Sequence, residues 1–114
     1  MFNQMVEHGE QLDRTYGALS HAVRRDLLAR LRSGPAAVTA LAEPYGMSLA
    51  AVSKHIHVLE DAGLLDRAVD GRTHFLALRP QYLFDARSWL DTYRTFWEQR
   101  LDALDAHLAE TPRR

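Results

Sequence analysis

Apolar residues in the middle of the chain recur at the spacing of one helical face. Val52, Ile56, Leu59 and Gly63 are separated by four, three and four residues, which predicts a helix with a single buried stripe. Ser48 suits the start of this helix because its hydroxyl can accept from the unpaired amides of the first turn. Gly63 suits the end because glycine readily adopts the left-handed conformation that closes a helix.

The opposite side of this helix is small, polar and free of acids over its first two turns, and the acids Glu60 and Asp61 come only near its end. A surface of this kind can approach a polyanion closely. The alternative is an ordinary solvent-facing helix. We predict contacts with the major groove of DNA, in which Lys54 meets either a guanine edge or a phosphate. The predicted contact residues are Ser48, Ala50, Ala51, Ser53, Lys54 and His57. His55 lies on another flank, where it can pack beside the preceding helix.

A hairpin is predicted directly after this helix. Two short runs rich in β-favouring residues, 64–69 and 72–78, surround Asp70-Gly71, a dipeptide that tolerates the positive φ angles of a type I′ turn. Arg67 and Arg72 flank the tip, and we predict that they contact phosphates or enter a minor groove. The alternative is a solvated hairpin with ordinary surface arginines.

The first half of the chain contains signals for three further helices. The first is expected over residues 4–16. The second is capped by Ser20 and ends at Ser33-Gly34-Pro35, and the third spans residues 36–45 with a break at Pro44. The apolar face of the second helix comprises Val23, Leu27, Leu28 and Leu31. Its outer surface carries arginines, of which Arg24, Arg25 and Arg32 are weaker candidates for DNA contact.

One long helix is predicted over residues 81–110, after the break at Arg79-Pro80. Its apolar stripe extends over about 20 residues, or ~30 Å, which is more than a domain of this size can cover by itself. We therefore predict a homodimer in which the terminal helices pack on each other, although the aromatic residues could instead line a pocket for an apolar effector. The predicted interface residues are Leu12, Tyr16, Trp89, Tyr93, Phe96, Trp97, Leu101, Leu104 and Leu108.

Composition limits the class of protein. The 114 residues are 46% hydrophobic and 25% charged, as in one ordinary globular domain. The absence of cysteine excludes disulfides and thiolate chemistry. There is neither a basic, apolar leader nor an apolar run of ~20 residues, so a cytoplasmic protein is expected.

Charge is distributed unevenly along the chain. The net charge of −1 does not by itself favour a nucleic-acid partner, but residues 20–79 hold eight Lys and Arg against six acids, whereas both flanks are net acidic. The slight positive excess therefore coincides with the predicted DNA reader. Binding to DNA should accordingly depend less steeply on salt than it does for a strongly basic protein.

The sequence around the central helix resembles the ArsR/SmtB family of bacterial repressors. The resemblance rests on Val52-Ser53-Lys54-His55-Ile56, Val58-Leu59 and Ala62-Gly63-Leu64-Leu65, with Leu41-Ala42 and Gly46 upstream, and on the earlier Ala18-Leu19-Ser20, Arg24-Arg25 and Leu28. It covers about residues 12–80. It implies a small dimeric winged helix that binds an operator.

Many members of that family sense metals, which raises the question of a metal site. The positions that align with the family's thiolate pair are Ala37 and Thr39, so that site is absent. A second family site uses Asp, His and Glu on the terminal helices, and Asp105, His107 and Glu110 stand near the corresponding place. Because a closed zinc site needs four ligands and this helix has a single histidine, we expect a solvated helix here, and no metal or other cofactor.

The expected fold is mainly α with a small two-stranded β-hairpin wing. It is a winged helix-turn-helix that dimerises through its N- and C-terminal helices. One domain spans residues 1–114, with a dimerisation helix over 1–19, the DNA-binding core over 20–79 and a second dimerisation helix over 81–110. The predicted function is that of a homodimeric transcriptional repressor on a near-palindromic operator. The alternatives are a winged-helix protein-interaction module and a metal-responsive repressor. No arrangement of nucleophile, base and oxyanion donors supports an enzyme.

Overall fold

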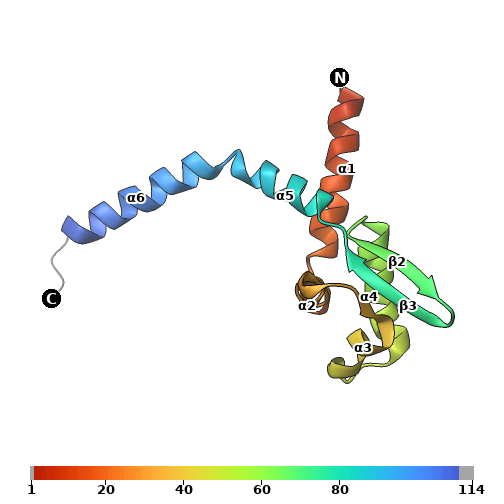
Figure 1. Ribbon diagram of the computed structural model, residues 1–114. Helices are drawn as coiled ribbons and strands as arrows, with labels where there is room; N and C mark the ends of the chain where they lie inside the picture. The colour runs from red at the N-terminus through yellow and green to blue at the C-terminus, as the bar shows by residue number, and fades with distance from the viewer. Residues whose placement is uncertain (1, 111–114) are drawn as a thin grey trace.

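The computed structural model describes residues 2–110, with side chains from residue 9 onward, and it shows a mainly helical chain with a small sheet (Figure 1). The α-helices are α1 (Phe2–Ala18), α2 (Ala22–Arg30), α3 (Val38–Ala42), α4 (Leu49–Asp61), α5 (Gln81–Asp91) and α6 (Arg94–Glu110). Two 3₁₀ turns, η1 (Leu31–Ser33) and η2 (Glu43–Tyr45), follow α2 and α3. The strands are β1 (Ala36–Ala37), β2 (Leu65–Asp70) and β3 (Thr73–Leu78).

The hydrophobic core lies where α2, α3 and α4 meet the sheet. Three of its members, Val52, Ile56 and Leu59, are fully buried, which confirms the predicted stripe of α4. The predicted caps of this helix are confirmed as well, because Ser48 Oγ accepts from the Ala51 amide at 3.1 Å and Gly63 has a φ of +77°. The other large apolar side chains that are fully buried in the described part of the chain are Leu27, Leu41, Leu64 and Leu76.

The sheet has three antiparallel strands in the order β1-β3-β2; the pair of β2 and β3 is the predicted two-stranded wing, and a third, short strand joins β3 on its other side. The third strand is formed by Ala36 and Ala37, which pair with Leu76 and Phe75. These residues were expected to begin a helix. Alanine has no preference for β-strands. Ala36 and Ala37 form a strand because their backbone pairs with the neighbouring β3. The predicted helix over 36–45 is thus divided into β1, α3 and η2.

The turn of the wing also differs from the prediction. Asp70 pairs with Thr73, so the two loop residues are Gly71 and Arg72. Gly71 has a φ of +62°, whereas no residue other than glycine has a positive φ in the part of the chain described. A type I′ turn needs positive φ at both loop positions. The observed pattern, with glycine at the first position alone, is that of a type II′ turn.

Two predicted details of the first helices need correction. Helix α1 runs to Ala18, two residues beyond the predicted end, and Ser20 then closes it by donating from Oγ to the Gly17 carbonyl at 2.6 Å. Ser20 therefore does not cap α2. The cap is His21, whose Nδ1 accepts from the Val23 amide at 3.1 Å.

The predicted single helix over 81–110 is two helices, α5 and α6, which meet at Thr92 and Tyr93. Thr92 Oγ1 donates to the Trp89 carbonyl at 2.7 Å, and the amides of Thr92 and Tyr93 bond three residues back rather than four. A hydroxyl that competes for a helical carbonyl and a tightened turn are both known causes of a helix break. The spacing of apolar residues is unaffected by such a break, so it was not detectable from periodicity.

Helix α6 extends away from the rest of the molecule (Figure 1). None of its residues is buried: Trp97 is 38% exposed, and Phe96, Leu101, Leu104 and Leu108 are all more than half exposed. The radius of gyration is 19.3 Å, whereas a compact chain of this length would have about 13 Å. The second half of the predicted dimer stripe is thus unpartnered within one chain.

Candidate nucleic-acid interface

The outer face of α4 is formed by Ala50, Lys54 and His57, which are spaced four and three residues apart and are all exposed. They lie opposite the buried stripe of the same helix, so packing in the core fixes the direction in which they point. The imidazole of His57 is 67% exposed. The first acid on this line is Asp61, in the last turn. The structure therefore brings together three of the predicted contact residues on one surface, in which Lys54 is the cation and His57 is the residue nearest to a carboxylate, that of Glu60 at 3.5 Å.

The remaining predicted contacts on α4 are less accessible. Ala51 and Ser53 are half-buried, on the flanks of the outer face. Ser48 is exposed, but its oxygen is already the acceptor that caps the helix. This leaves only its hydroxyl proton and one lone pair for a phosphate or base. Major-groove contact by these residues stays a prediction.

His55 packs on α2 rather than beside α3. Its ring centroid lies 4.3 Å from that of His21, and its Nδ1 accepts from Arg24 Nη1 at 3.1 Å. Burial lowers the pKa of His55, and the charges of His21 and Arg24 act in the same direction. The neutral form of His55 is therefore favoured where α4 packs on α2.

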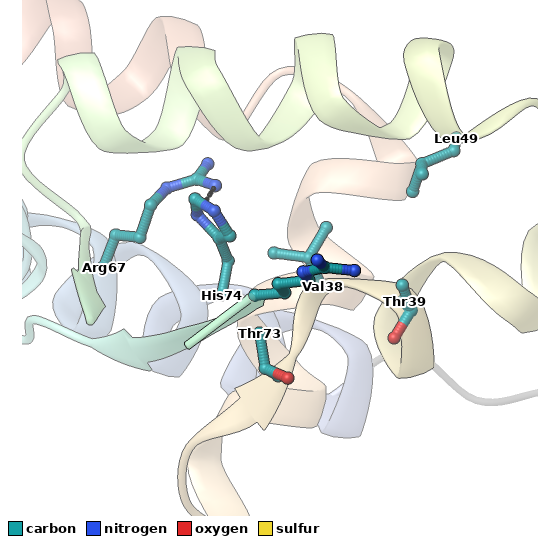
Figure 2. Close-up of a pocket in the computed structure, with 7 residues that line it drawn as sticks. Val38, Thr39, Leu49, Arg67, Thr73 and His74 are labelled. Carbon is teal, nitrogen blue, oxygen red and sulfur yellow. Dashed lines mark hydrogen bonds between the residues drawn. The ribbon is translucent and has the colours of Figure 1, made fainter. Parts of the chain in front are cut away.

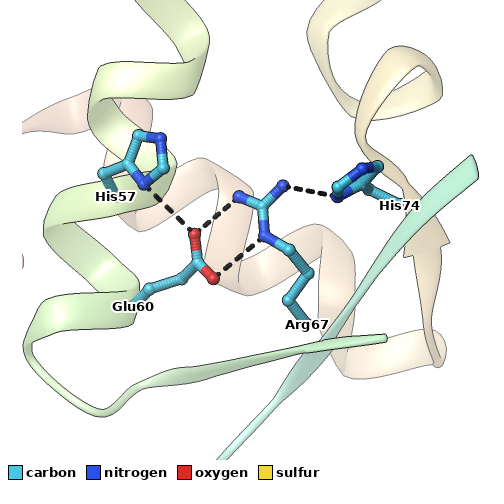
Figure 3. Close-up of polar contacts among 4 residues, drawn as sticks. All are labelled: His57, Glu60, Arg67 and His74. Carbon is cyan, nitrogen blue, oxygen red and sulfur yellow. Dashed lines mark hydrogen bonds and ion pairs between the residues drawn. The ribbon is translucent and has the colours of Figure 1, made fainter. Parts of the chain in front are cut away.

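Arg67 forms a brace between the wing and α4 (Figure 3). Its Nη2 and Nε donate to Glu60 Oε1 and Oε2 at 2.6 and 3.1 Å, and its Nη1 donates to His74 Nδ1 at 3.1 Å. His57 Nδ1 lies 3.5 Å from the same carboxylate. Arg67 was predicted to contact DNA, but its donors are largely engaged within the chain. Its clearest role here is to fix the angle between hairpin and helix.

The brace should contribute to stability in a pH-dependent way. Hydrogen bonding from Arg67 holds the pKa of Glu60 below its ordinary value of 4.5. A depressed pKa means that the contribution is complete above about pH 4.5 and is lost as pH falls through the folded-state pKa. Glu60→Gln should therefore reduce the free energy of unfolding by about 1 kcal/mol at pH 7. Urea unfolding of both proteins at pH 7 and pH 3 should show this difference shrinking in acid, and an equal difference at both pH values would contradict it.

The arginines of α2 cap neighbouring helices rather than project freely. Arg24 Nε donates to the Ala18 carbonyl at 2.7 Å, and Arg25 Nη1 donates to that of Leu19 at 2.8 Å, which satisfies the C-terminal end of α1. Arg30 donates in the same way to the Leu41 carbonyl at 2.7 Å. These groups hold α1, α2 and α3 in register. Arg32 donates to the Ala29 carbonyl at 3.3 Å within its own turn.

The predicted dimer residues fall into two groups. Leu12 and Tyr16 of α1 are half-buried, and Tyr16 donates to the Ala86 carbonyl at 2.6 Å while its ring meets Trp89 edge-on at 6.0 Å. Tyr16 thus joins α1 to α5 inside one chain. The second group, on and before α6, comprises Trp89, Tyr93, Phe96, Trp97, Leu101, Leu104 and Leu108, which are 38–57% exposed.

The candidate metal residues Asp105, His107 and Glu110 lie on α6. Among the side chains of residues 9–110, no group of three or more His, Cys, Asp or Glu is placed so that it could hold a metal ion.

The sequence did not identify three residues near the wing, His74, Thr73 and Leu49, and it did not predict that Glu60 pairs with Arg67. His74 lies diagonally across the hairpin from Arg67, because Arg67 pairs with Leu76. The hairpin signal could have placed these two side chains on one face, since residues two apart share a face. No local signal links Glu60 to Arg67, because their contact depends on how the strand folds back on the helix.

The arrangement of α2, α3, α4 and the hairpin is that of a winged helix-turn-helix, the class of DNA-binding fold in which α4 is the reader. Residues 19–68 match a sequence family described as a helix-turn-helix domain. The HTH-type transcriptional regulator Rv2034 of Mycobacterium tuberculosis is 37% identical over 89 residues, which cover 78% of this chain and 80% of that protein.

Solved structures agree with this class. The crystal structure of an ArsR family transcriptional regulator is similar with a TM-score of 0.72 and 38% identity, over 77% of this chain and 97% of the other. A homodimeric winged helix-turn-helix DNA-binding domain of Mycobacterium bovis shares the fold with a TM-score of 0.64 and 22% identity, over 88% and 90% of the two chains. This chain belongs to the ArsR family of winged helix-turn-helix transcriptional regulators. These are regulators and not enzymes, which confirms the expectation that no catalytic activity is present.

Proposed function

We propose that this regulator binds a near-palindromic operator as a homodimer and represses transcription by occluding the polymerase. The observation that carries the proposal is the outer face of α4, where exposed Ala50, Lys54 and His57 form a line that carries a cation and meets its first acid only at Asp61 in the last turn. Small side chains allow the helix to approach base edges, and Lys54 supplies the donor. Arg72, exposed at the tip of the wing, is suited to an adjacent phosphate or minor groove.

The homodimer is supported by the exposed apolar stripe of α6, which one chain leaves uncovered. A second copy would cover it with the same surface, as two-fold symmetry requires. The two reader helices would then lie about one duplex turn apart, or ~34 Å. The homodimeric domain of M. bovis shows that this fold supports such an assembly. A protein that binds an operator must be in the compartment that contains the DNA, which agrees with the expected cytoplasmic location. No helix among residues 2–110 could span a membrane.

Lys54→Ala tests the reader. We expect the affinity for operator DNA from the protein's own promoter to fall by 1–3 kcal/mol, or about 5- to 150-fold, in a mobility-shift assay with competitor duplex. A lost base contact should lower the ratio of specific to non-specific affinity. A lost phosphate contact should weaken every duplex alike and reduce the salt slope by about one.

Arg87→Ala is the matched control, since it removes one exposed cation from α5, away from the reader. It should leave operator affinity within about twofold of the wild type. Unchanged affinity in Lys54→Ala would place the reader elsewhere. If wild-type protein binds no duplex in preference to competitor, the protein-interaction module is the better description.

A further inference from the structure

A hollow of about 290 Å³ lies between the wing and the beginnings of α3 and α4 (Figure 2). The wing and the N-terminal end of α4, which are the two parts of the proposed DNA-binding surface, both contribute to its walls. It is lined by Val38, Thr39, Leu49, Arg67, Arg72, Thr73 and His74. The operator-binding proposal uses Arg72 from this set but gives no role to the apolar residues.

The charged groups of the lining are cationic. Arg67 and Arg72 contribute guanidinium groups and His74 an imidazole, and no Asp or Glu lines the hollow. The charge of Arg67 is balanced by Glu60, which pairs with it at 2.6 Å and is not part of the lining. Arg72 makes no ion pair with any of the residues that the structure describes. It is therefore the group best able to take a carboxylate, which guanidinium can bind through two parallel hydrogen bonds.

The remainder of the lining comprises two threonines, Thr39 and Thr73, and two apolar residues, Val38 and Leu49. Of the two apolar residues, Leu49 is 51% exposed although it is a large aliphatic residue at the first position of α4. A DNA phosphate would satisfy the cation but would leave this surface uncovered. An anion with an apolar body would satisfy both. The volume is at the lower limit of small-molecule sites, which begin at about 300 Å³, so the body should be about the size of one phenyl ring or a short alkyl chain.

We propose that this hollow binds a small organic carboxylate with an apolar body, held through Arg72 and packed on Val38 and Leu49. Such a ligand would neutralise Arg72 and separate the wing from the N-terminal end of α4, so it would lower operator affinity. By linkage, DNA would lower the affinity for the ligand by the same factor. Only this regulatory consequence rests on the proposed operator binding, because occupation of the hollow can be measured without DNA.

The test is a titration of the DNA-free full chain with benzoate and hexanoate, followed by amide chemical shifts, with benzyl alcohol as the uncharged counterpart of benzoate. We expect saturable shifts at Leu49, Arg72 and Thr73, and at least tenfold weaker binding of benzyl alcohol. Thr39→Leu places a larger side chain in the hollow and should weaken the binding of both carboxylates at least tenfold. Ala40→Leu adds the same side chain at a neighbouring exposed position outside the lining and should bind as the wild type does. Thermal unfolding checks that both variants are folded.

The outcomes separate this proposal from the operator proposal. Absence of saturable shifts with both carboxylates, equal binding of benzyl alcohol, or unchanged binding in Thr39→Leu would each overturn the site, whatever the protein does with DNA. A wild-type protein that binds benzoate but no duplex would overturn the operator proposal and leave the site standing. If the ligand site and operator binding are both confirmed, saturating benzoate should lower operator affinity at least tenfold in the wild type and less than twofold in Thr39→Leu.

Discussion

Replacing two leucines of α6 by acids, Leu101→Glu with Leu104→Glu, should convert the protein to a monomer and lower its operator affinity by about 10²- to 10⁴-fold. Both side chains are more than half exposed in one chain, so their burial depends on a second copy, and carboxylates at that contact would face each other. The loss in affinity follows because a monomer engages one half-site and loses the gain from bivalent binding. Sedimentation at micromolar concentration and mobility shift on the full operator measure the two effects.

A matched control is available on the other side of the same helix. Thr95→Glu with Ala106→Glu introduces the same charge at exposed positions roughly opposite the stripe. This variant should remain dimeric and bind the full operator within a few-fold of the wild type. On an isolated half-site, all three proteins should bind with similar affinity. A leucine variant that stays dimeric, or a monomer that keeps full operator affinity, would refute the proposed assembly.

Gly63→Ala should destabilise the folded protein by about 2–4 kcal/mol. Gly63 ends α4 with a φ of +77°, which is unfavourable for alanine, and a Cβ built there would lie 2.6 Å from a ring carbon of Tyr82 at the beginning of α5. The ring or the end of the helix would have to move. Because Gln11 Nε2 donates to the adjacent Ala62 carbonyl at 2.9 Å, such a shift also disturbs the contact of α1 with the reader helix. Urea unfolding gives the free energy directly.

Gly71→Ala isolates the conformational cause. Gly71 has a comparable φ of +62°, but nothing lies within 4 Å of its Cβ position. Its replacement should cost only the conformational term of a positive φ, about 1–3 kcal/mol. Because the two glycines lie in different kinds of turn, the contact with Tyr82 is measured by adding Tyr82→Ala to Gly63→Ala, which should recover part of the loss. No recovery in the double variant would show that the close packing of α5 on the end of α4 contributes nothing.

The sequence by itself determined the elements whose signals are local. The stripe of Val52, Ile56 and Leu59, the cap at Ser48 and the glycine at position 63 each reflect the chemistry of one helix, and all are observed. The hairpin was predicted for the same reason, since a glycine turn between β-favouring runs forms from neighbouring residues. Together with the family resemblance, these signals were sufficient to predict the winged helix-turn-helix class.

Tertiary structure alone decided the features that depend on distant partners. Ala36 and Ala37 become a strand only because β3 lies beside them, and Arg67 becomes a brace only because the wing folds back onto Glu60. The break at Thr92 leaves the apolar spacing unchanged, so periodicity predicts one helix where hydrogen bonding produces two. Local propensity and periodicity describe what a segment can form. Which side chains are used within the chain, and which remain for DNA, a ligand or a second copy, follows only from the packing of segments against one another.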